Sequence, residues 1–285
     1  MAITNFIPEL WAAALLEVWW NETVFAALVN REYEGIATRG NTVNITGVVV
    51  PTVSDYAAAG RTTSAEDISD TGIQLTIDQE KSTDFYVDDI DRAQAAGSLS
   101  AYADAAGVAL VEDSDKFIAS LMITGGTPVT LSPSTSGSTT FTGGLPGSGD
   151  DCFNILKDLR KQLNKNAVPS ANRVAVINAE FEGLLLTAGS KLTTFYQVDD
   201  TEGLRNATLG QLLGMRIVIS NNLSAFNTPQ AIAFAPRAAA YVSQIDQVEA
   251  MRAQNKFADR IRALHVYGGK VVRPIGVAVF NQGGS

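Results

Sequence analysis

Residues 98–122, SLSAYADAAGVALVEDSDKFIASLM, keep a helical period of apolar side chains longer than any other part of the chain. The spacings of three and four predict one helix with a single apolar face, which only Ser114 interrupts. Ser98 or Ser100 can cap its first turn, and Gly125 and Gly126 can end it. At about 1.5 Å per residue, the helix would be a strut roughly 35 Å long. The apolar positions are Leu99, Ala103, Ala106, Leu110, Phe117 and Leu121.

The composition favours a globular protein of one large or two ordinary domains. Of 285 residues, 46% are hydrophobic and 18% are charged, and this balance excludes a disordered chain. The net charge of −9 argues against a dedicated nucleic-acid-binding module. The single cysteine, Cys152, excludes an internal disulfide framework and a cysteine-rich zinc site. The absence of a basic residue before Arg31 predicts an intracellular protein without a signal peptide or membrane span.

The first forty residues contain all three tryptophans of the chain, Trp11, Trp19 and Trp20. A helix formed there would be apolar over most of its circumference, so something must cover it. The cover is either the body of the same chain or a neighbouring subunit. A neighbouring subunit is a serious alternative because tryptophan is enriched at protein interfaces.

A long hairpin is predicted between this arm and the helix. Residues 42–53 are rich in β-branched side chains, and residues 73–78 alternate apolar and polar. The loop between them has no apolar face of its own, which is typical of functional or mobile loops. Residues 81–91 are expected to lead from the second arm into the helix.

An uncharged segment rich in glycine, serine and threonine, 125–149, marks a boundary after the helix. The pattern beyond it predicts an α/β unit and then antiparallel strands. A tight hairpin turn is expected at Gly268 and Gly269. The predicted helices are 150–165 and 181–186, and the predicted strands are 173–178, 215–220, 248–257, 259–267 and 270–280.

No catalytic or metal-binding motif was found. His265 is the only histidine and is expected to be an ordinary strand residue, and Cys152 is expected to pack in a core. The phosphate-loop, dinucleotide-binding and nucleophile-elbow patterns are absent. An acidic cluster is interpreted as a solvated or partner-facing surface, because it lacks the spacing of a calcium loop. The cluster comprises Asp84, Asp88, Asp89 and Asp91.

The order of these parts resembles the major capsid proteins of tailed bacteriophages that have the Hong Kong 97-type fold. Three sequence segments carry the same resemblance: VNREYEG at 29–35, LTIDQEKSTDFYVDDIDRAQ at 75–94 and RIRALHVYGGKVVRP at 260–274. The resemblance implies an α+β fold with an N-terminal arm, an extended β-hairpin E-loop, a P-domain with a long spine helix, and an α/β A-domain. The implied boundaries are 1–41 for the arm, 42–91 for the E-loop, 92–126 with 241–285 for the P-domain, and 127–240 for the A-domain.

The resemblance also implies a function: self-assembly into hexamers and pentamers of an icosahedral head that encloses double-stranded DNA. The expected partners are other copies of the chain, a scaffolding protein, a portal, in some phages a decoration protein, and the packaged DNA, bound without sequence specificity. The protein would be part of the virion, assembled in the host cytoplasm, and would not be an enzyme. No cofactor or metal is expected. Lys81, on the stem of the predicted hairpin, is poorly placed for the isopeptide cross-link of some relatives.

Two other readings remain open at this stage. One is a phage tail protein or another self-assembling structural layer protein, and the other is an intracellular enzyme with a dispersed site. The missing catalytic constellation weighs against the enzyme.

The distribution of charge suggests how subunits could meet. Residues 54–91 hold ten acids and two bases, a balance of −8, whereas residues 237–273 hold seven bases and three acids, a balance of +4. Opposite patches could pair across an interface and set its register. With the tryptophans, the candidate intersubunit residues are Trp11, Trp19, Trp20, Glu66, Asp67, Asp70, Arg260, Arg262 and Lys270.

Overall fold

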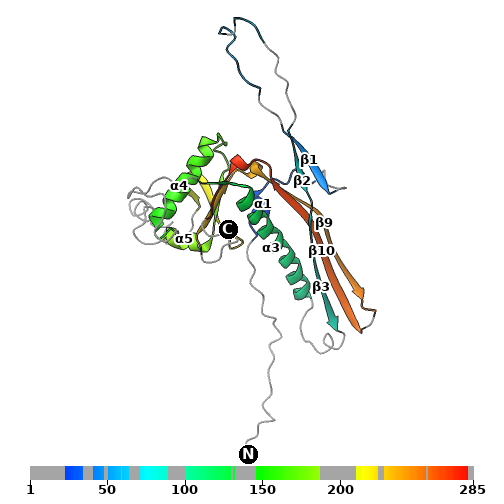
Figure 1. The fold of residues 1–285 in the computed structure, drawn as a ribbon. Helices are drawn as coiled ribbons and strands as arrows, with labels where there is room; N and C mark the ends of the chain where they lie inside the picture. Colours follow the sequence, from blue (N-terminus) through cyan, green and yellow to red (C-terminus); the bar gives the residue numbers. More distant parts are fainter. Residues whose placement is uncertain are drawn as a thin grey trace, which may run out of the picture.

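The long helix predicted from the sequence is present as α3, Ser100–Gly125 (Figure 1). The computed structural model describes residues 23–34, 41–47, 51–58, 60–63, 71–88, 100–129, 131, 146–186, 210–223, 228–254 and 256–281. The described residues form two halves, one built around α3 and a three-stranded sheet and the other around a six-stranded sheet (Figure 1). The chain passes between these halves three times.

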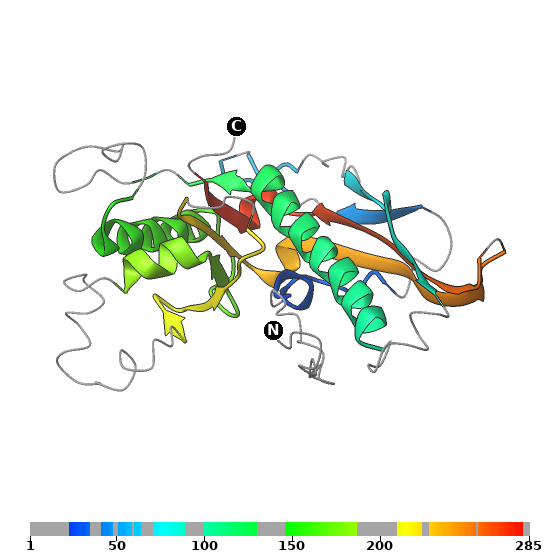
Figure 2. The same ribbon diagram turned by 90° about the horizontal axis from the view of Figure 1, so that it is seen from below.

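The three-stranded sheet has the order β3-β10-β9 and is antiparallel throughout. Its strands are β3 (Gln79–Asp88), β9 (Ala239–Arg252) and β10 (Ala258–Val271). Helix α3 lies across one face, as seen from below in Figure 2. The Phe117 and Tyr267 rings meet there edge to face at 5.4 Å. The segment that was expected only to lead into the helix is therefore a full edge strand, β3.

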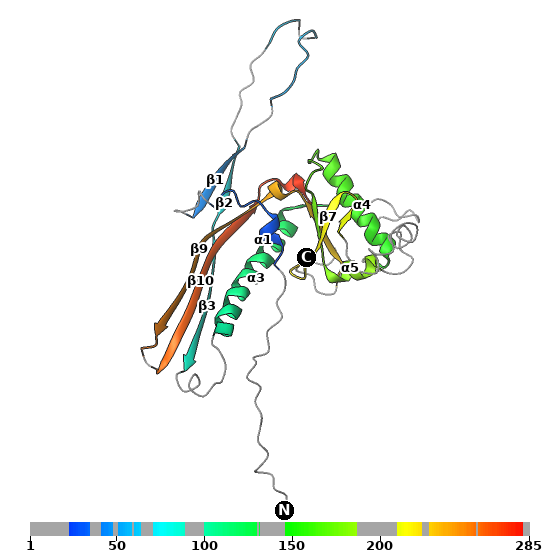
Figure 3. The ribbon, with the colours of Figure 1, turned by 180° about the vertical axis from the view of Figure 1, so that it is seen from behind.

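The hairpin is confirmed: its first strand begins at the predicted residue 42, and its second strand lies two residues earlier than predicted. Strand β1 (Thr42–Gly47) pairs antiparallel with β2 (Thr71–Thr76), with Thr42 opposite Thr76 and Gly47 opposite Thr71. Beyond these strands the hairpin extends away from both halves (Figures 1 and 3). It is attached at its base, where Leu75 and Ile77 are buried against Val242.

The predicted turn at Gly268 and Gly269 is wrong: both residues lie inside β10, and the chain reverses direction between β9 and β10 at residues 253–257. The glycines serve close packing instead of a turn. A Cβ atom at Gly268 would lie 2.3 Å from the Thr76 carbonyl oxygen, so β10 can pass the base of the hairpin only without a side chain there.

The six-stranded sheet has the order β4-β11-β8-β5-β7-β6 and mixes parallel with antiparallel pairs. Helices α4 (Gly149–Lys165) and α5 (Ala179–Leu185) cover one face, with the Ser148 and Asn178 side chains capping their first turns. The strands are β4 (Thr127–Pro128), β5 (Val174–Ile177), β6 (Gln211–Leu212), β7 (Met215–Ile219), β8 (Gln230–Phe234) and β11 (Val277–Asn281). The strand predicted over 270–280 is interrupted at Pro274, so its second part belongs to this sheet.

The two halves share one hydrophobic core. The opposite face of the six-stranded sheet, including Val176 and Phe234, packs against Ile118 and Met122 of α3. The short helix α1 (Phe25–Leu28) closes the same core with Phe25, which has no exposed surface. Figure 3 shows α1 beside α3 from behind. The halves are therefore not separately packed bodies.

Three short connections carry the chain between the halves at one place. The first is the α3–β4 link at Gly125 and Gly126, and the other two are the 3-10 helices η2 (Pro236–Ala238) and η3 (Pro274–Gly276). The Thr127 hydroxyl donates to the Pro274 carbonyl at 2.9 Å, and a Cβ at Gly276 would lie 2.8 Å from that of Ala238. The close packing at both points fixes where the halves meet.

Candidate functional site

The described residues contain no group of three or more histidine, cysteine, aspartate or glutamate side chains placed to hold a metal ion. Cys152 is fully buried among the side chains beneath α4, and burial raises the pKa of its thiol to about 12. A thiol of that pKa is a packing group, as the sequence predicted. No helix in the described part of the chain is both long and apolar enough to span a membrane.

His265 belongs to a buried polar cluster between β9, β10 and α3. Its Nε2 lies 3.1 Å from the Ser243 hydroxyl and 3.5 Å from that of Tyr241, while its ring is 4.8 Å from that of Tyr267. The Tyr267 hydroxyl donates to Asp113 at 2.7 Å. Burial, together with this hydrogen bond, holds the pKa of Tyr267 above its usual range. The arrangement is a buried polar network in the core, with His265 as a strand residue whose Nδ1 has no hydrogen-bond partner among the described residues.

Asp115 is the polar group on which three parts of the chain meet, and it is fully buried at the middle of α3. Its Oδ2 accepts from the Val24 backbone N–H at 3.2 Å and from the Asn222 amide at 2.9 Å. Its Oδ1 accepts from the Ala26 N–H at 3.0 Å. One carboxylate thus ties the start of the described chain and the loop after β7 to the helix.

Asp115 lies on a face of α3 outside the apolar stripe that the sequence predicts. Of the predicted stripe, Leu110 is buried and Phe117 and Leu121 are partly buried. The fully covered face adds Ser114, Asp115, Ile118, Ala119 and Met122, because the six-stranded sheet and α1 cover the second half of the helix on another side. Leu99 and the side chain of Ala103 lie outside the described residues.

The candidate intersubunit arginines are already paired within the subunit, on the face of the three-stranded sheet opposite α3. Arg260 makes a two-pronged ion pair with Asp84, its Nε lying 2.8 Å from one carboxylate oxygen. Arg262 donates to Glu249 at 2.5 Å and 3.0 Å. The Arg260 guanidinium holds the pKa of Asp84 below its usual range. The acidic cluster therefore contributes at least one carboxylate to this sheet.

These ion pairs within one subunit, Arg260–Asp84 and Arg262–Glu249, change the predicted pairing of charges between subunits. Arg260 and Arg262 could reach a neighbour's acids only by sharing or giving up the present partners. Lys270 is exposed near the end of β10 and makes no ion pair with a described residue. Contacts of all three residues with a neighbouring subunit stay a prediction. Trp11, Trp19, Trp20, Glu66, Asp67 and Asp70 lie outside the described residues.

The tip of the hairpin is held by hydrogen bonds between its own residues. Asp55 Oδ1 accepts from the N–H groups of Ala57 and Ala58 at 2.9 and 3.3 Å, and the Arg61 N–H donates to the Tyr56 carbonyl at 2.9 Å. Gly60 and Arg61 adopt positive φ angles of 67° and 61° to close the turn. The tip leaves Tyr56 54% exposed. The sequence signal for this turn is the spacing of Asp55 and Gly60, which lie in a segment predicted only as a loop.

Comparisons with known proteins identify the family of this chain. The family model described as phage capsid protein matches residues 71–280. A solved structure from Mycobacterium phage Che8 is 58% identical, covers all of both chains and has a TM-score of 0.89. A search of the curated proteins returned no match.

More distant structures share the fold. The capsid structure of the cyanophage P-SCSP1u has 17% identity and a TM-score of 0.77, covering 100% of this chain and 95% of that one. The mature capsid of bacteriophage PhiM1 has 13% identity and a TM-score of 0.71, with 96% and 91% covered. The family model spans well over half of the sequence, and the Che8 identity extends over its full length. The chain therefore belongs to the phage capsid protein family.

Proposed function

We propose that copies of this capsid protein assemble as hexamers and pentamers into the icosahedral head of a tailed phage, enclosing double-stranded DNA. Family membership supports a structural role in the virion, and we propose that the protein has no catalytic function. Assembly would take place in the host cytoplasm. A scaffolding protein, a portal and a decoration protein are the partners we propose from the family resemblance.

The observation that carries the proposal is the shape of the subunit. The hairpin extends far from both halves, and its tip has no contact with them in the described structure (Figures 1 and 3). A solvated hairpin of this length has no core of its own, because an isolated two-stranded ribbon is at best marginally stable in water. Packing on a neighbouring subunit would give it the cover it lacks.

We assign the parts of the subunit on the same basis. Residues 42–91 would be the E-loop, although β3 within this range pairs with β10 of the three-stranded sheet. Helix α3 would be the spine of the P-domain, and the six-stranded sheet with α4 and α5 the A-domain. Residues 1–41 would be the arm. The proposed P-domain range 241–285 includes β11, although β11 is hydrogen-bonded between β4 and β8 of the proposed A-domain sheet.

Expression of the whole chain followed by size-exclusion chromatography and negative-stain microscopy tests the proposal. Closed shells or particles of capsomer size support it. A protein that stays a 30 kDa monomer at all concentrations, alone and with the scaffolding protein of its phage, would contradict it. Tubes or flat sheets instead of closed shells would favour another self-assembling layer.

A further inference from the structure

Arg173 carries a buried positive charge that no acidic residue in the described part of the chain offsets by an ion pair. The residue is only 4% exposed. Its guanidinium donates to three neutral groups, the Pro169 carbonyl at 2.8 Å, the Asn164 side-chain oxygen at 2.7 Å and the Val168 carbonyl. Burial, together with the nearby charge of Arg160, lowers the pKa of Arg173. A buried charge without a counter-charge is unfavourable, so an anion that reached Arg173 would stabilise this region.

Two more arginines lie close to Arg173. Arg173 and the exposed Arg216 line one pocket of about 740 Å³, here called the arginine pocket. Gly214 lines it too, and a Cβ atom on Gly214 would lie 3.9 Å from the guanidinium carbon of Arg160. The described residues that line the pocket include no aspartate or glutamate. The pocket therefore gathers positive charge and presents an anion with no competing carboxylate from these residues.

A second pocket of about 440 Å³, here called the junction pocket, adjoins the first and has the same sign of charge. The two pockets share Pro236 and the loop residues 171–172. Arg237 and Arg273 line the junction pocket, are both exposed and form no ion pair with a residue that the structure describes. Its described lining residues again include no acidic side chain. The two pockets therefore form one basic surface around η2.

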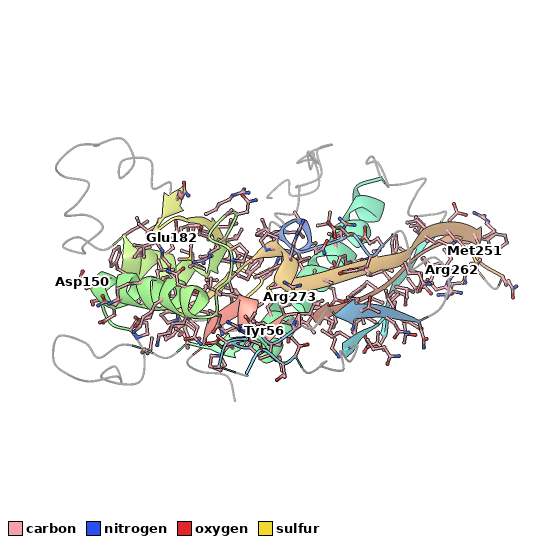
Figure 4. The ribbon with its side chains drawn as sticks, turned by 90° about the horizontal axis from the view of Figure 1, so that it is seen from above. Tyr56, Asp150, Glu182, Met251, Arg262 and Arg273 are labelled. Atoms are coloured by element: carbon pink, nitrogen blue, oxygen red, sulfur yellow. The ribbon has the colours of Figure 1, made fainter. Side chains whose placement is uncertain are left out.

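The exposed side of α4 extends this surface. The second half of the helix presents exposed bases at spacings of three and four, which place them on one side. Asn166, directly after α4, lines the junction pocket, so the helix leads into that pocket. Asp150, in the acidic first turn of α4, lies at the outer end of this half, away from Arg273 (Figure 4). The basic face, as we define it, comprises Lys157, Arg160, Lys161, Lys165, Arg173, Arg216, Arg237 and Arg273.

We propose that the basic face binds the phosphate backbone of the double-stranded DNA enclosed by the head, and that this face of the subunit therefore points inward. The planar guanidinium groups of Arg216, Arg237 and Arg273 can each donate two hydrogen bonds to a phosphate. A phosphate in the arginine pocket also supplies the counter-charge that Arg173 lacks. This inference rests on the proposed function, because it needs a shell with DNA inside.

DNA suits the basic face better than a protein partner does. It carries one negative charge per about 1.7 Å of its axis, so it can meet cations that are spread over α4 and two pockets. Interfaces between proteins are instead centred on apolar and aromatic side chains. No large apolar side chain among the described residues lining the arginine pocket is exposed. The rest of the chain has excess negative charge, since the whole carries −9, and it repels DNA from other faces.

Binding of a fluorescent DNA duplex to unassembled full-length subunits at different salt concentrations tests the basic face. Each phosphate that a base neutralises contributes about −0.9 to the slope of log K against log salt concentration. The exposed arginines Arg160, Arg216, Arg237 and Arg273 should therefore give the wild type a slope of about −3 to −4. Arg216→Gln with Arg237→Gln, one from each pocket, should make the slope shallower by roughly 2 and lower the affinity at about 0.1 M salt by roughly tenfold or more.

The matched control is Lys81→Gln with Lys256→Gln, which changes the net charge equally but on β3 and in the 253–257 turn. It should change the affinity by less than about twofold, because charges more than about 10 Å away are screened at this salt concentration. Circular dichroism confirms the fold of each variant. Equal losses in the two variants, or no binding of the duplex by the wild type, would contradict the proposal. So would binding of polyglutamate as tight as that of the duplex, since the face would then suit an acidic protein.

Lysine acetylation tests the same face in assembled heads. Lys157 and Lys165 should be acetylated several-fold more slowly in DNA-filled heads than in heads emptied of DNA, and mass spectrometry measures the difference. Lys256, in the 253–257 turn, is the internal control and should react equally in both samples. Equal protection of Lys157 and Lys165 in filled and emptied heads would mean that a neighbouring subunit covers them. Full reactivity in both samples would mean that DNA does not, and either result overturns the proposal.

Microscopy of the same heads separates this inference from the proposed function. Normal heads in which Lys157 and Lys165 react equally with and without DNA overturn the DNA-binding face and leave the capsid function intact. A wild-type chain that forms no shells overturns the function itself.

Discussion

Among single residues, Asp115 contributes most visibly to holding separate parts of the chain together. Replacing Asp115→Ala leaves the N–H groups of Val24 and Ala26 and the amide of Asn222 without their buried acceptor. Each lost acceptor costs about 1–3 kcal/mol, so the free energy of unfolding should fall by about 2–4 kcal/mol. Urea unfolding of unassembled subunits measures the change.

The matched control for this variant is Lys116→Ala, one position along the same helix. Its ammonium pairs with Glu112 on the surface and should change stability by no more than about 0.5 kcal/mol. Equal effects of the two variants would mean that the Asp115 hydrogen bonds contribute no more than an exposed ion pair.

Replacement by alanine should have opposite effects on the free energy of unfolding at two glycines. A Cβ at Gly268 would overlap the backbone of Thr76 and Ile77, so Gly268→Ala should lower the free energy of unfolding by about 3 kcal/mol or more. A Cβ at Gly107 of α3 meets nothing within 4 Å, so Gly107→Ala should raise it by up to about 1 kcal/mol through better helix propensity. Thermal unfolding of the subunit compares them, and a stabilised Gly268→Ala variant would contradict the close approach.

The Asp84–Arg260 pair should make stability depend on pH in the acid range. Because the folded-state pKa of Asp84 is lowered, its contribution is present above the ordinary value of 3.8 and is lost as the pH falls through the lowered value. The difference in urea midpoint between wild type and Asp84→Asn should therefore be constant at neutral pH and shrink below about pH 4. A difference that grows on acidification would show the opposite linkage.

At the level of elements, α3 and the hairpin should respond differently to proline. Ala106→Pro in the interior of α3 removes a backbone hydrogen bond and costs on the order of 3 kcal/mol. Val53→Pro, at a 96% exposed position before the hairpin turn, should leave the stability of the subunit within about 0.5 kcal/mol. Circular dichroism with urea unfolding checks both, and equal damage would contradict the role of α3 as the central strut.

The elements that the sequence predicted well are those whose local pattern has a single explanation. The helix α3 and the helix α4 were predicted to within three residues at either end, because periodicity and caps agree there. The hairpin β1–β2 followed from alternation and β-branched residues.

The elements that were missed depend on distant partners. Gly268 and Gly269 look like a turn in sequence, and only distant neighbours explain their close packing: Thr76 for Gly268, and Ala240 with Leu121 for Gly269. The pairing of β3 with β10, and of Arg260 with Asp84, joins residues 170 or more positions apart. No local spacing encodes such a register, so the sequence shows the opposite charge of the two segments but not the ion pair that joins them within one subunit.

For the whole molecule, the structure limits how many N-terminal residues can be removed without loss of stability. Removal of residues 1–30 would take out Phe25 and the Asn30 backbone contacts to Ala239 and Tyr241, which belong to the shared core. Removal of residues 1–22 leaves every one of these contacts. We therefore expect the shorter deletion to fold normally and fail to assemble, and the longer one to be destabilised by about 3 kcal/mol or more.

Circular dichroism and sedimentation velocity distinguish fold from assembly in these two truncations. Normal shells from the chain lacking residues 1–22 would mean that the tryptophans of the arm are not needed between subunits.

The three chain crossings at the junction have a mechanical consequence. Strands β9 and β10 have 14 residues each, so each spans about 45 Å. Their ends at Arg252 and Ala258 therefore lie far from the place where η2, η3 and the α3–β4 link touch. The three-stranded sheet is thus a long lever whose fulcrum is that contact. A rotation of a few degrees at the fulcrum displaces the 253–257 turn by several ångströms, and torque applied at the turn is resisted by the shared core behind Phe25 and Met122.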